Sequence, residues 1–321
     1  MDPTEREGIP AAFLERLAQI LAPADYGPAV ASFSVPRTAG FRLNPLLSGP
    51  DPVTELKTQR VDPVPVTWLP GAYTVPAAQR EALVSSAAFE EGRIYLQNLS
   101  SMVPPVVLDV QPGEEVLDLT AAPGSKTHQM ACVMKNRGRI TAVESVRARY
   151  YKLRDNMERL GAECVRPFFQ DGTLTWRYRP EFFDRVLLDA PCSSEGRFRT
   201  DQPETTRYWS PRKVTEMSRK QRRLLYSAIR CLKPGGRLVY STCSFSPEEN
   251  EVVVQKMLTK FGDAIRIVPI TLDVPQFRSG MTEWKGREFD GSISMARRIV
   301  PDATMDGFFV CGLEKVASTS D

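Results

Sequence analysis

The sequence has few of the residues that would make it a disulfide-bonded, metal-binding or membrane protein. Only one histidine, His128, occurs in 321 residues, and the six cysteines include no CxxC pair. Most zinc sites need more of these ligands, so no metal is expected. No apolar run approaches the roughly 18 residues of a membrane span, and the start MDPTEREGIP lacks the apolar core of a secretion signal. These absences predict a cytoplasmic protein with reduced thiols and no membrane contact.

What is present is the composition of an ordinary globular protein, with 42% hydrophobic and 25% charged residues. The length suggests about two domains. Fifteen of the 26 prolines lie in residues 1–112, where they break the chain into short pieces after an amphipathic helix at FLERLAQIL. We therefore expect a small N-terminal α+β accessory domain over residues 1–95, a larger domain over residues 96–316, and a tail over residues 317–321.

From Glu114 onward, apolar strands alternate with helices. The expected strands read EEVLDLT, GRITAVES, CVRPFFQ, FFDRVLLDA, GRLVYST, IRIVPI and GFFVCGLEK. RARYYKLRDNMERLG is typical of a helix and ends on Gly161, where a C-cap glycine belongs. This alternation predicts an α/β fold with a doubly wound, Rossmann-like parallel sheet. Ligands of such sheets bind beyond the carboxyl ends of the strands.

The turn after the first of these strands, DLTAAPGSKT, favours a nucleoside ligand without a pyrophosphate. It has small residues but neither GxGxxG nor the P-loop pattern, which disfavours dinucleotides and nucleoside triphosphates. Glu144 ends the second strand, where an acid can accept both ribose hydroxyls. Asp171 follows the third strand, where it can meet an adenine edge. Together these positions predict S-adenosylmethionine as the cofactor.

Two cysteines follow the next two strands, Cys192 in LLDAPCSSEG and Cys243 in VYSTCSFSPEENE. The other four cysteines are interpreted as small buried hydrophobic residues, whereas strand-end loops beside a ligand are where reactive groups lie. A thiolate that adds to carbon 6 of a pyrimidine makes carbon 5 able to attack a methyl donor. The carbon-5 proton must then be removed before the thiolate leaves. An acid near ring N3 would favour the addition, and Asp189 is available.

The stretches DLTAAPGSKT, LLDAPCSSEG, CLKPGGRLVYSTCSFSPEENE and DGFFVCGLEK resemble the NOL1/NOP2/Sun family of RNA cytosine-C5 methyltransferases. The resemblance runs from about Tyr95 to about Lys315. It implies a class I S-adenosylmethionine-dependent methyltransferase domain in which Cys243 is the nucleophile and Cys192 assists release of the methylated base. It also implies that Lys126 lies near the catalytic centre. The implied cofactor contacts are Ala121, Ala122, Pro123, Gly124, Ser125, Lys126, Glu144, Arg149, Asp171 and Asp189.

The basic segment 196–223 is expected to bind RNA. It carries nine Arg or Lys residues against three acids, together with the rings Phe198, Tyr208 and Trp209 that could stack on bases. The target cytosine must be single-stranded or flipped out, because a helix hides its carbon 6. The accessory domain is expected to contribute to RNA binding, and the protein is expected to be a monomer.

Ribosomal RNA is the first expected substrate, because GRFRTDQPETTRYWSP and APGSKT are most similar to the bacterial ribosomal-RNA branch of the family. Transfer RNA is the close alternative. A non-catalytic RNA-binding ribosome assembly factor is a second alternative, against which the complete set of cysteines and acids argues. A small-molecule or protein methyltransferase is a third, against which the cysteine pair and the basic segment argue.

Overall fold

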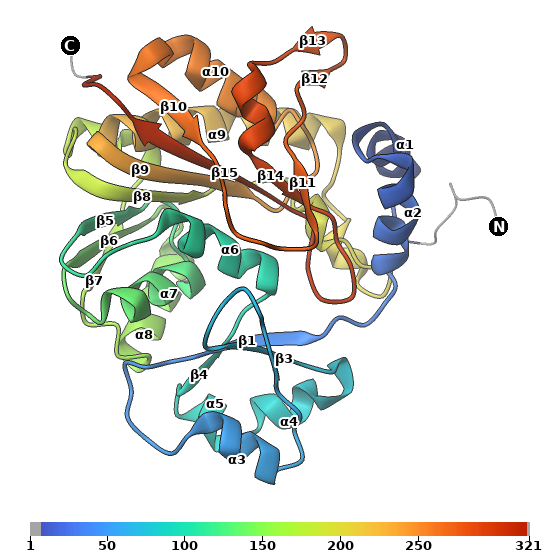
Figure 1. Cartoon of the computed structure of the whole chain (residues 1–321), viewed down its shortest axis with the longest axis vertical. Helices are drawn as coiled ribbons and strands as arrows, with labels where there is room; N and C mark the ends of the chain where they lie inside the picture. Colours follow the sequence, from blue (N-terminus) through green and yellow to red (C-terminus); the bar gives the residue numbers. More distant parts are fainter. Residues whose placement is uncertain (1–7, 320–321) are drawn as a thin grey trace.

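A nine-stranded mixed sheet forms the centre of residues 8–319, the part of the chain that the computed structural model describes (Figure 1). Residues 1–7 of the expected accessory domain, and residues 320 and 321 of the expected tail, lie outside this part. Five strands run parallel in the order β9-β8-β5-β6-β7. They are β5 (Glu115–Asp118), β6 (Arg139–Glu144), β7 (Val165–Phe169), β8 (Phe183–Asp189) and β9 (Leu232–Thr242). The expected Rossmann-like α/β fold is confirmed.

The remaining strands lie on the β9 side and change direction. The strand β15 (Phe308–Lys315) is antiparallel to β9, and β10 (Ile265–Val268) is antiparallel to β15. The strands β14 (Arg297–Ile299) and β11 (Phe277–Ser279) complete this edge. The prediction of a parallel strand at GFFVCGLEK is therefore wrong. An apolar run indicates burial on both faces but not direction. The described segment between β14 and β15 contains no α-helix of the kind that parallel crossovers use.

Helices cover both faces of the sheet, and alternate strand residues pack against them. On one face, Val116 of β5 packs with α6 (Leu99–Leu108), α7 (Ser125–Met134) and α8 (Arg147–Arg159). On the other, Leu117 packs with α9 (Pro211–Cys231) and α10 (Glu251–Phe261). Gly161 follows α8 with φ +69°, as its expected place at the end of that helix requires.

The first 96 residues contribute two separate pieces. The helices α1 (Ala11–Ile20) and α2 (Pro23–Ser32) pack on the larger domain through a cluster that includes Phe13, Phe198 and Phe245. A second sheet, β2-β3-β1-β4, has its own core with three short helices and lies apart from α1 and α2 in Figure 1. Its strands are β1 (Ala39–Leu43), β2 (Val64–Pro65), β3 (Ala72–Val75) and β4 (Ile94–Leu96); its helices are α3 (Pro52–Thr58), α4 (Arg80–Val84) and α5 (Ala87–Glu90). The domain division at residue 95 stays a prediction.

The small sheet is tied to the larger domain by buried polar side chains. Arg42 of β1 donates to the Ser125 backbone oxygen at 3.1 Å and to Gln97 at 2.8 Å. Asn44 donates to the Leu160 oxygen at 3.1 Å. These bonds attach β1 to the beginning of α7 and the end of α8.

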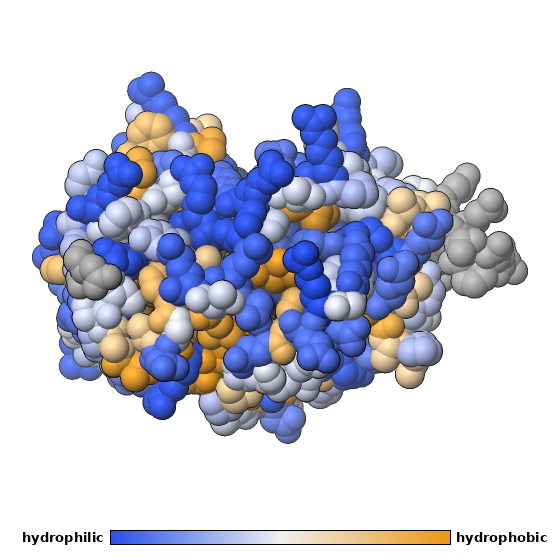
Figure 2. Space-filling model, turned by 90° about the horizontal axis from the view of Figure 1, so that it is seen from above, coloured by the Kyte–Doolittle hydropathy of each residue, from blue (hydrophilic) through white to orange (hydrophobic). Residues whose placement is uncertain are grey.

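The upper surface in the view of Figure 1 is mostly hydrophilic, with separate apolar patches (Figure 2). It includes the two-stranded ribbon of β12 (Glu283–Trp284) and β13 (Arg287–Glu288). None of the helices within residues 8–319 is long and apolar enough to cross a membrane.

Candidate active site

A cavity of about 400 Å³ lies beyond the carboxyl ends of β5, β6, β8 and β9. It brings together residues from turns that are far apart in the sequence. All the expected catalytic and cofactor residues except Gly124 line it: Ala121, Ala122, Pro123, Ser125, Lys126, Glu144, Arg149, Asp171, Asp189, Cys192 and Cys243. The volume is within the range of small-molecule sites.

The turn between β5 and α7 forms one wall of the cavity. Gly124 has φ +107°, and a Cβ there would lie 2.6 Å from the Cε atom of Met157, so this position requires glycine. Arg149 and Asn156 of α8 hold the turn by donating to the backbone oxygens of Ala122 and Pro123, at 2.5 and 2.8 Å. No side chain caps the beginning of α7. The first amide groups of this helix are therefore available to a ligand.

Three carboxylates follow the ends of β5, β6 and β7. Glu144 is buried, accepts from the Val146 amide at 2.8 Å and lies 3.7 Å from Arg149. Asp171 is exposed and accepts from the Thr173 amide at 2.9 Å. Asp118 is buried, and its Oδ1 atom has no hydrogen-bond partner within the described structure. Burial raises the pKa of Asp118 to about 6. An unpaired buried acceptor and a buried strand-end acid suit a ligand with hydroxyl and amine donors, as in S-adenosylmethionine.

A partly buried ion pair lies between this wall and the cysteines. Lys126 Nζ donates to Asp189 Oδ2 and to Ser101 Oγ, both at 2.6 Å. Ser241 Oγ donates to the other Asp189 oxygen at 2.8 Å. Asp189 is thereby fixed in orientation, and the pair places an ammonium and a carboxylate side by side at the cavity wall.

The two expected cysteines are neighbours in the cavity. Cys192 Sγ and Cys243 Sγ lie 3.3 Å apart, and both residues are half-buried. The hydrogen bond from Cys192 and the positive charge of Arg197 lower the pKa of the Cys243 thiol. The same hydrogen bond, together with burial, raises the pKa of Cys192. Because the two pKa values are pushed apart, one thiol is set up as a thiolate and the other as its proton-carrying partner.

Comparison with known proteins identifies the family. Residues 105–314 match the family described as 16S rRNA methyltransferase RsmB/F. The chain belongs to the NOL1/NOP2/Sun family. The expectation of an S-adenosylmethionine-dependent RNA (cytosine-C5) methyltransferase is thus confirmed at the level of the family.

Relatives within the Sun family act on different RNAs. The chain is 37% identical to the tRNA (cytosine(49)-C(5))-methyltransferase of Pyrococcus abyssi, over 87% of this chain and 89% of that one. It is 36% identical to the ribosomal RNA small subunit methyltransferase F of Serratia proteamaculans, over 96% of this chain but only 63% of that one. A solved structure described as a methyltransferase homolog from Pyrococcus horikoshii aligns with a TM-score of 0.82 at 33% identity, covering 96% of each chain.

One loop of the cavity follows β8 and holds Cys192, and another follows β9 and holds Cys243. Two fully buried glutamates, which the sequence analysis missed, connect these two cysteine loops. Glu195 accepts from the amides of Phe245 and Ser246, both at 2.9 Å. Glu249 accepts from the Ser193 amide at 2.9 Å and from Gln221 Nε2 at 3.0 Å. Each glutamate follows one cysteine in the sequence and bonds the loop of the other. Proximity to the cysteines within the same two motifs was the signal that could have found them.

Ser244 lies between the two glutamates. Its hydroxyl lies 2.9 Å from Glu195 Oε2 and 2.5 Å from Glu249 Oε2. The Ser244 hydroxyl can donate to only one of these two carboxylates at a time. Burial and the charge of Glu195 raise the pKa of Glu249 to about 7. Glu249 is therefore the carboxyl group that holds a proton near neutral pH.

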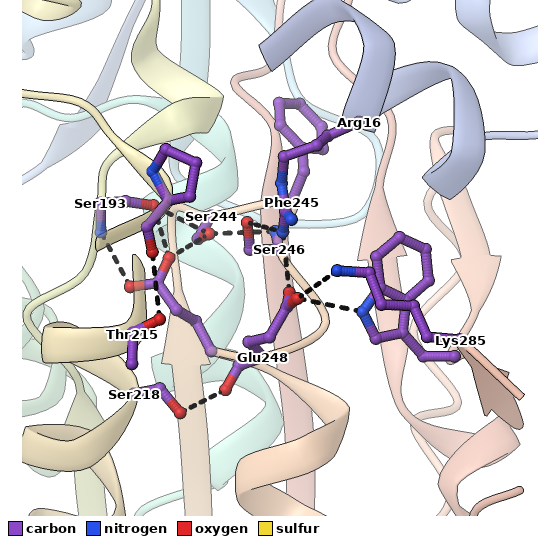
Figure 3. A network of polar contacts seen from close by, with 12 residues as sticks. Arg16, Ser193, Thr215, Ser218, Ser244, Phe245, Ser246, Glu248 and Lys285 are labelled. Atoms are coloured by element: carbon purple, nitrogen blue, oxygen red, sulfur yellow. Dashed lines mark hydrogen bonds and ion pairs between the residues drawn. The ribbon is translucent and has the colours of Figure 1, made fainter. Parts of the chain in front are cut away.

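The loop that follows Cys243 is also held by contacts with elements outside the central sheet (Figure 3). Glu248 accepts from Arg16 of α1 at 2.8 Å and from Trp284 Nε1 of β12 at 3.1 Å. Its backbone oxygen accepts from Ser218 of α9 at 2.6 Å. Figure 3 shows Ser193 and Ser244 approaching each other on one side of this loop, with Arg16 and Lys285 on the other.

The basic segment 196–223 is only partly arranged as expected. Arg197 and Lys220 line the cavity, and the exposed side chains of Arg219 and Arg223 lie next to it. The expectation of base stacking by Phe198 is wrong, because its ring is fully buried against Phe13.

The stacking role stays a prediction for Trp209, which is half-buried. Its ring packs on Phe13, and its Nε1 atom donates to Glu195 at 2.8 Å. These rings hold α1 and the cysteine loops together, and only Tyr208 of the three is exposed. The sequence of a basic segment does not show whether its aromatic rings face solvent or the core.

Proposed function

We propose that this chain methylates carbon 5 of an unpaired cytosine in RNA through a covalent adduct with Cys243. The observation that carries the proposal is the 3.3 Å contact between two thiols whose pKa values are shifted in opposite directions. A thiolate is the reactive form of cysteine. Cys243 is therefore the nucleophile, and Cys192 is the group that assists release.

The cofactor is held by the other side of the cavity. We assign the ribose hydroxyls to Glu144, the adenine edge to Asp171, and the amino-acid part to the Ala121–Lys126 turn with Asp118. Arg149 positions this turn through the Ala122 oxygen. S-adenosylmethionine supplies the methyl group when it is bound.

The chemistry begins when Cys243 Sγ forms a bond to carbon 6 of the cytosine. Ring N3 takes a proton from the Lys126–Asp189 pair, and the former double-bond electrons make carbon 5 the nucleophile toward the methyl group. The carbon-5 proton must then leave so that the bond between carbon 6 and Sγ can break and the ring is restored. Cys192 accepts this proton once its own thiol proton has passed to solvent. N3 returns its proton to the Lys126–Asp189 pair, and Cys243 is released as a thiolate.

Ribosomal RNA is the first substrate to test. It is supported by the match of residues 105–314 to a family described by 16S rRNA and by the 36% identity to a small-subunit methyltransferase. Transfer RNA is the second candidate, because the tRNA enzyme is matched over 89% of its length. A cytoplasmic location and a monomeric state stay predictions.

The test is methyl transfer with the purified chain. Unmodified ribosomal RNA and transfer RNA are incubated separately with labelled S-adenosylmethionine, and the nucleosides are identified by mass spectrometry. We expect 5-methylcytosine in one RNA class, and bisulfite sequencing then locates it. RNA binding without any 5-methylcytosine would favour the ribosome assembly factor instead.

A further inference from the structure

An exposed group of aromatic side chains lies where α8 meets β7. Phe169 is 56% exposed, Phe168 48% and Tyr151 39%. The ring centroids of Phe169 and Tyr150 lie 5.9 Å apart, and those of Tyr150 and Tyr151 lie 5.4 Å apart. Phe169, Tyr150 and Tyr151 thus form a continuous row of rings, which we call the ring row. The strand β7 is an edge strand, so within the described structure no further strand pairs with it.

Positive charges flank the ring row. The guanidinium of Arg154 lies 5.2 Å from the Tyr151 ring centroid, and that of Arg147 lies 5.9 Å from it. The helix α8 carries five Arg or Lys residues and two acids. Aromatic faces beside cations are the combination that binds unpaired nucleic acid, because bases stack on the rings and phosphates pair with the cations.

The ring row continues into the active site. Phe169 lines a second cavity, of about 660 Å³, together with Arg219, Lys220 and Arg223 of α9. Asp171 and Glu216 also line it, so three cations face two acids. Lys220 and Asp171 line the first cavity as well. A path therefore leads from the cysteines past the basic side of α9 to Phe169 and on to Tyr151.

We propose that the ring row is a stacking surface for unpaired bases of the RNA substrate beyond the target cytosine. This inference rests on the proposed function. The occupant is RNA because the path joins the row to the cavity in which the cytosine reacts, and because the rings are bordered by cations. Phe198 and Trp209, the rings expected for this role, are packed against α1, whereas the ring row faces solvent.

The test compares RNA affinity with catalysis. The double variant Tyr151→Ala and Phe169→Ala is measured with a long single-stranded RNA that contains the target cytosine. We expect a loss of affinity on the order of tenfold for each ring. The KM for RNA rises correspondingly, while kcat at saturating RNA and the affinity for S-adenosylmethionine stay as in the wild type. The aromatic replacements Tyr151→Phe and Phe169→Trp keep wild-type affinity.

Two controls separate stacking from general damage. Tyr178, whose ring is also exposed, lines neither cavity, so Tyr178→Ala leaves RNA affinity unchanged. A short RNA that holds only the target and its nearest neighbours cannot reach Tyr151. The single variant Tyr151→Ala therefore binds this short RNA as tightly as the wild type does, while its affinity for the long RNA falls.

Equal affinity of the double variant and the wild type for the long RNA overturns the inference, and so does an equal decrease in the affinity of Tyr151→Ala for the long and the short RNA. Either result leaves the proposed function intact if the wild type still makes 5-methylcytosine. Failure of the wild type to methylate any RNA refutes the proposed function instead. Retained RNA affinity together with weaker binding of a protein partner would identify the row as a protein-docking surface, which also overturns the inference.

Discussion

At the scale of single residues, the two thiols are chemically different although they touch. The Cys192 hydrogen bond and Arg197 both stabilise a negative charge on Cys243. The same contact, together with burial, raises the pKa of Cys192. The order of reactivity follows from this asymmetry, since two isolated buried thiols would both stay protonated.

Replacing each thiol distinguishes their roles. In Cys243→Ala the nucleophile is absent, so activity vanishes and no covalent species forms, while RNA still binds. In Cys192→Ala the nucleophile remains but release fails, so a protein–RNA adduct accumulates and survives denaturing electrophoresis. An adduct in Cys243→Ala alone would reverse the assignment. If neither variant traps RNA and both keep activity, the thiols serve packing only, with stability decreases of about 1 kcal/mol.

Arg197 predicts a change in the pH profile. Because its charge lowers the pKa of Cys243, activity falls as pH decreases through that pKa. In Arg197→Gln the pKa rises, and the acid limb of log(kcat/KM) moves to higher pH by roughly one unit. Arg197→Lys keeps the charge and leaves the limb near its original place. An unmoved limb in Arg197→Gln would show that the hydrogen bond from Cys192 acts alone.

At the scale of elements, the ends of β5 and β6 form the side of the cavity to which we assign the cofactor. Glu144 is the last residue of β6, and its carboxylate is oriented by the Val146 amide at 2.8 Å. Arg149 contacts both Glu144 and the β5–α7 turn. Arg149 therefore connects the beginning of α8 to the end of β6 and to the β5–α7 turn.

Removal of the Glu144 carboxylate should weaken cofactor binding. The charge-assisted hydrogen bonds that it would make are worth roughly 1.5–3 kcal/mol, which is about a tenfold to hundredfold rise in the dissociation constant. Calorimetry with Glu144→Ala and S-adenosylmethionine measures this directly. The exposed Glu163 ends no strand, and Glu163→Ala serves as the control. An unchanged affinity of Glu144→Ala would remove this residue from the site.

The two cysteine loops are a second structural unit, and Glu249 makes its stability depend on pH. The folded state holds the Glu249 proton up to about pH 7, whereas the unfolded chain releases it near pH 4.5. The folded state binds more protons in this window, so its stability falls as pH rises from 4.5 to 7 and then stays level. The difference corresponds to about 3 kcal/mol.

The substitution Glu249→Gln tests this dependence. A neutral amide resembles the protonated acid, so the variant loses less stability than the wild type between pH 5 and pH 7.5 in chemical unfolding. Asp118, whose pKa is also raised, is present in both proteins and cancels in the comparison. Glu249→Ala leaves the Ser193 amide without this acceptor and Gln221 Nε2 with only the Pro191 oxygen, which costs roughly 1–3 kcal/mol at every pH. Parallel pH profiles of the wild type and Glu249→Gln would contradict the assignment.

At the scale of the whole molecule, α9 links the catalytic cavity to the outer surface. Its apolar side packs on the sheet, and its basic side contributes to both cavities. This arrangement is consistent with an RNA that crosses the carboxyl edge of the sheet.

Neutralising the exposed cations of α9 should flatten the salt dependence of RNA binding. In the triple variant of Arg212, Arg219 and Arg223 to Gln, each RNA phosphate that is no longer neutralised by a cation reduces the slope by roughly 0.7–0.9. Lys220 is left in place because it lines the cofactor cavity, and S-adenosylmethionine affinity should not change. The matched control is Lys256→Gln with Lys260→Gln on α10, two exposed lysines that line neither cavity. A slope equal to that of the wild type would make this side of α9 an ordinary solvated face.

Local sequence patterns were enough to predict the elements of this fold and the place where its strand-end residues meet. The periodicity of apolar residues predicted the parallel strands and the helices between them, and the strand ends predicted where Glu144, Cys192 and Cys243 would meet. This works because the carboxyl ends of parallel strands lie at one edge of a sheet, so order along the chain becomes proximity in space.

Only the tertiary structure decided which side chains face one another. The reversed direction of β15, the burial of Phe198 and the contacts of Glu195 and Glu249 with Ser244 all depend on packing between segments far apart in the chain. The exposed ring row became visible for the same reason, since Phe169 and Tyr151 belong to different elements. Strand direction, burial and protonation depend on residues that come together only in the folded chain. A local sequence pattern carries no information about those residues.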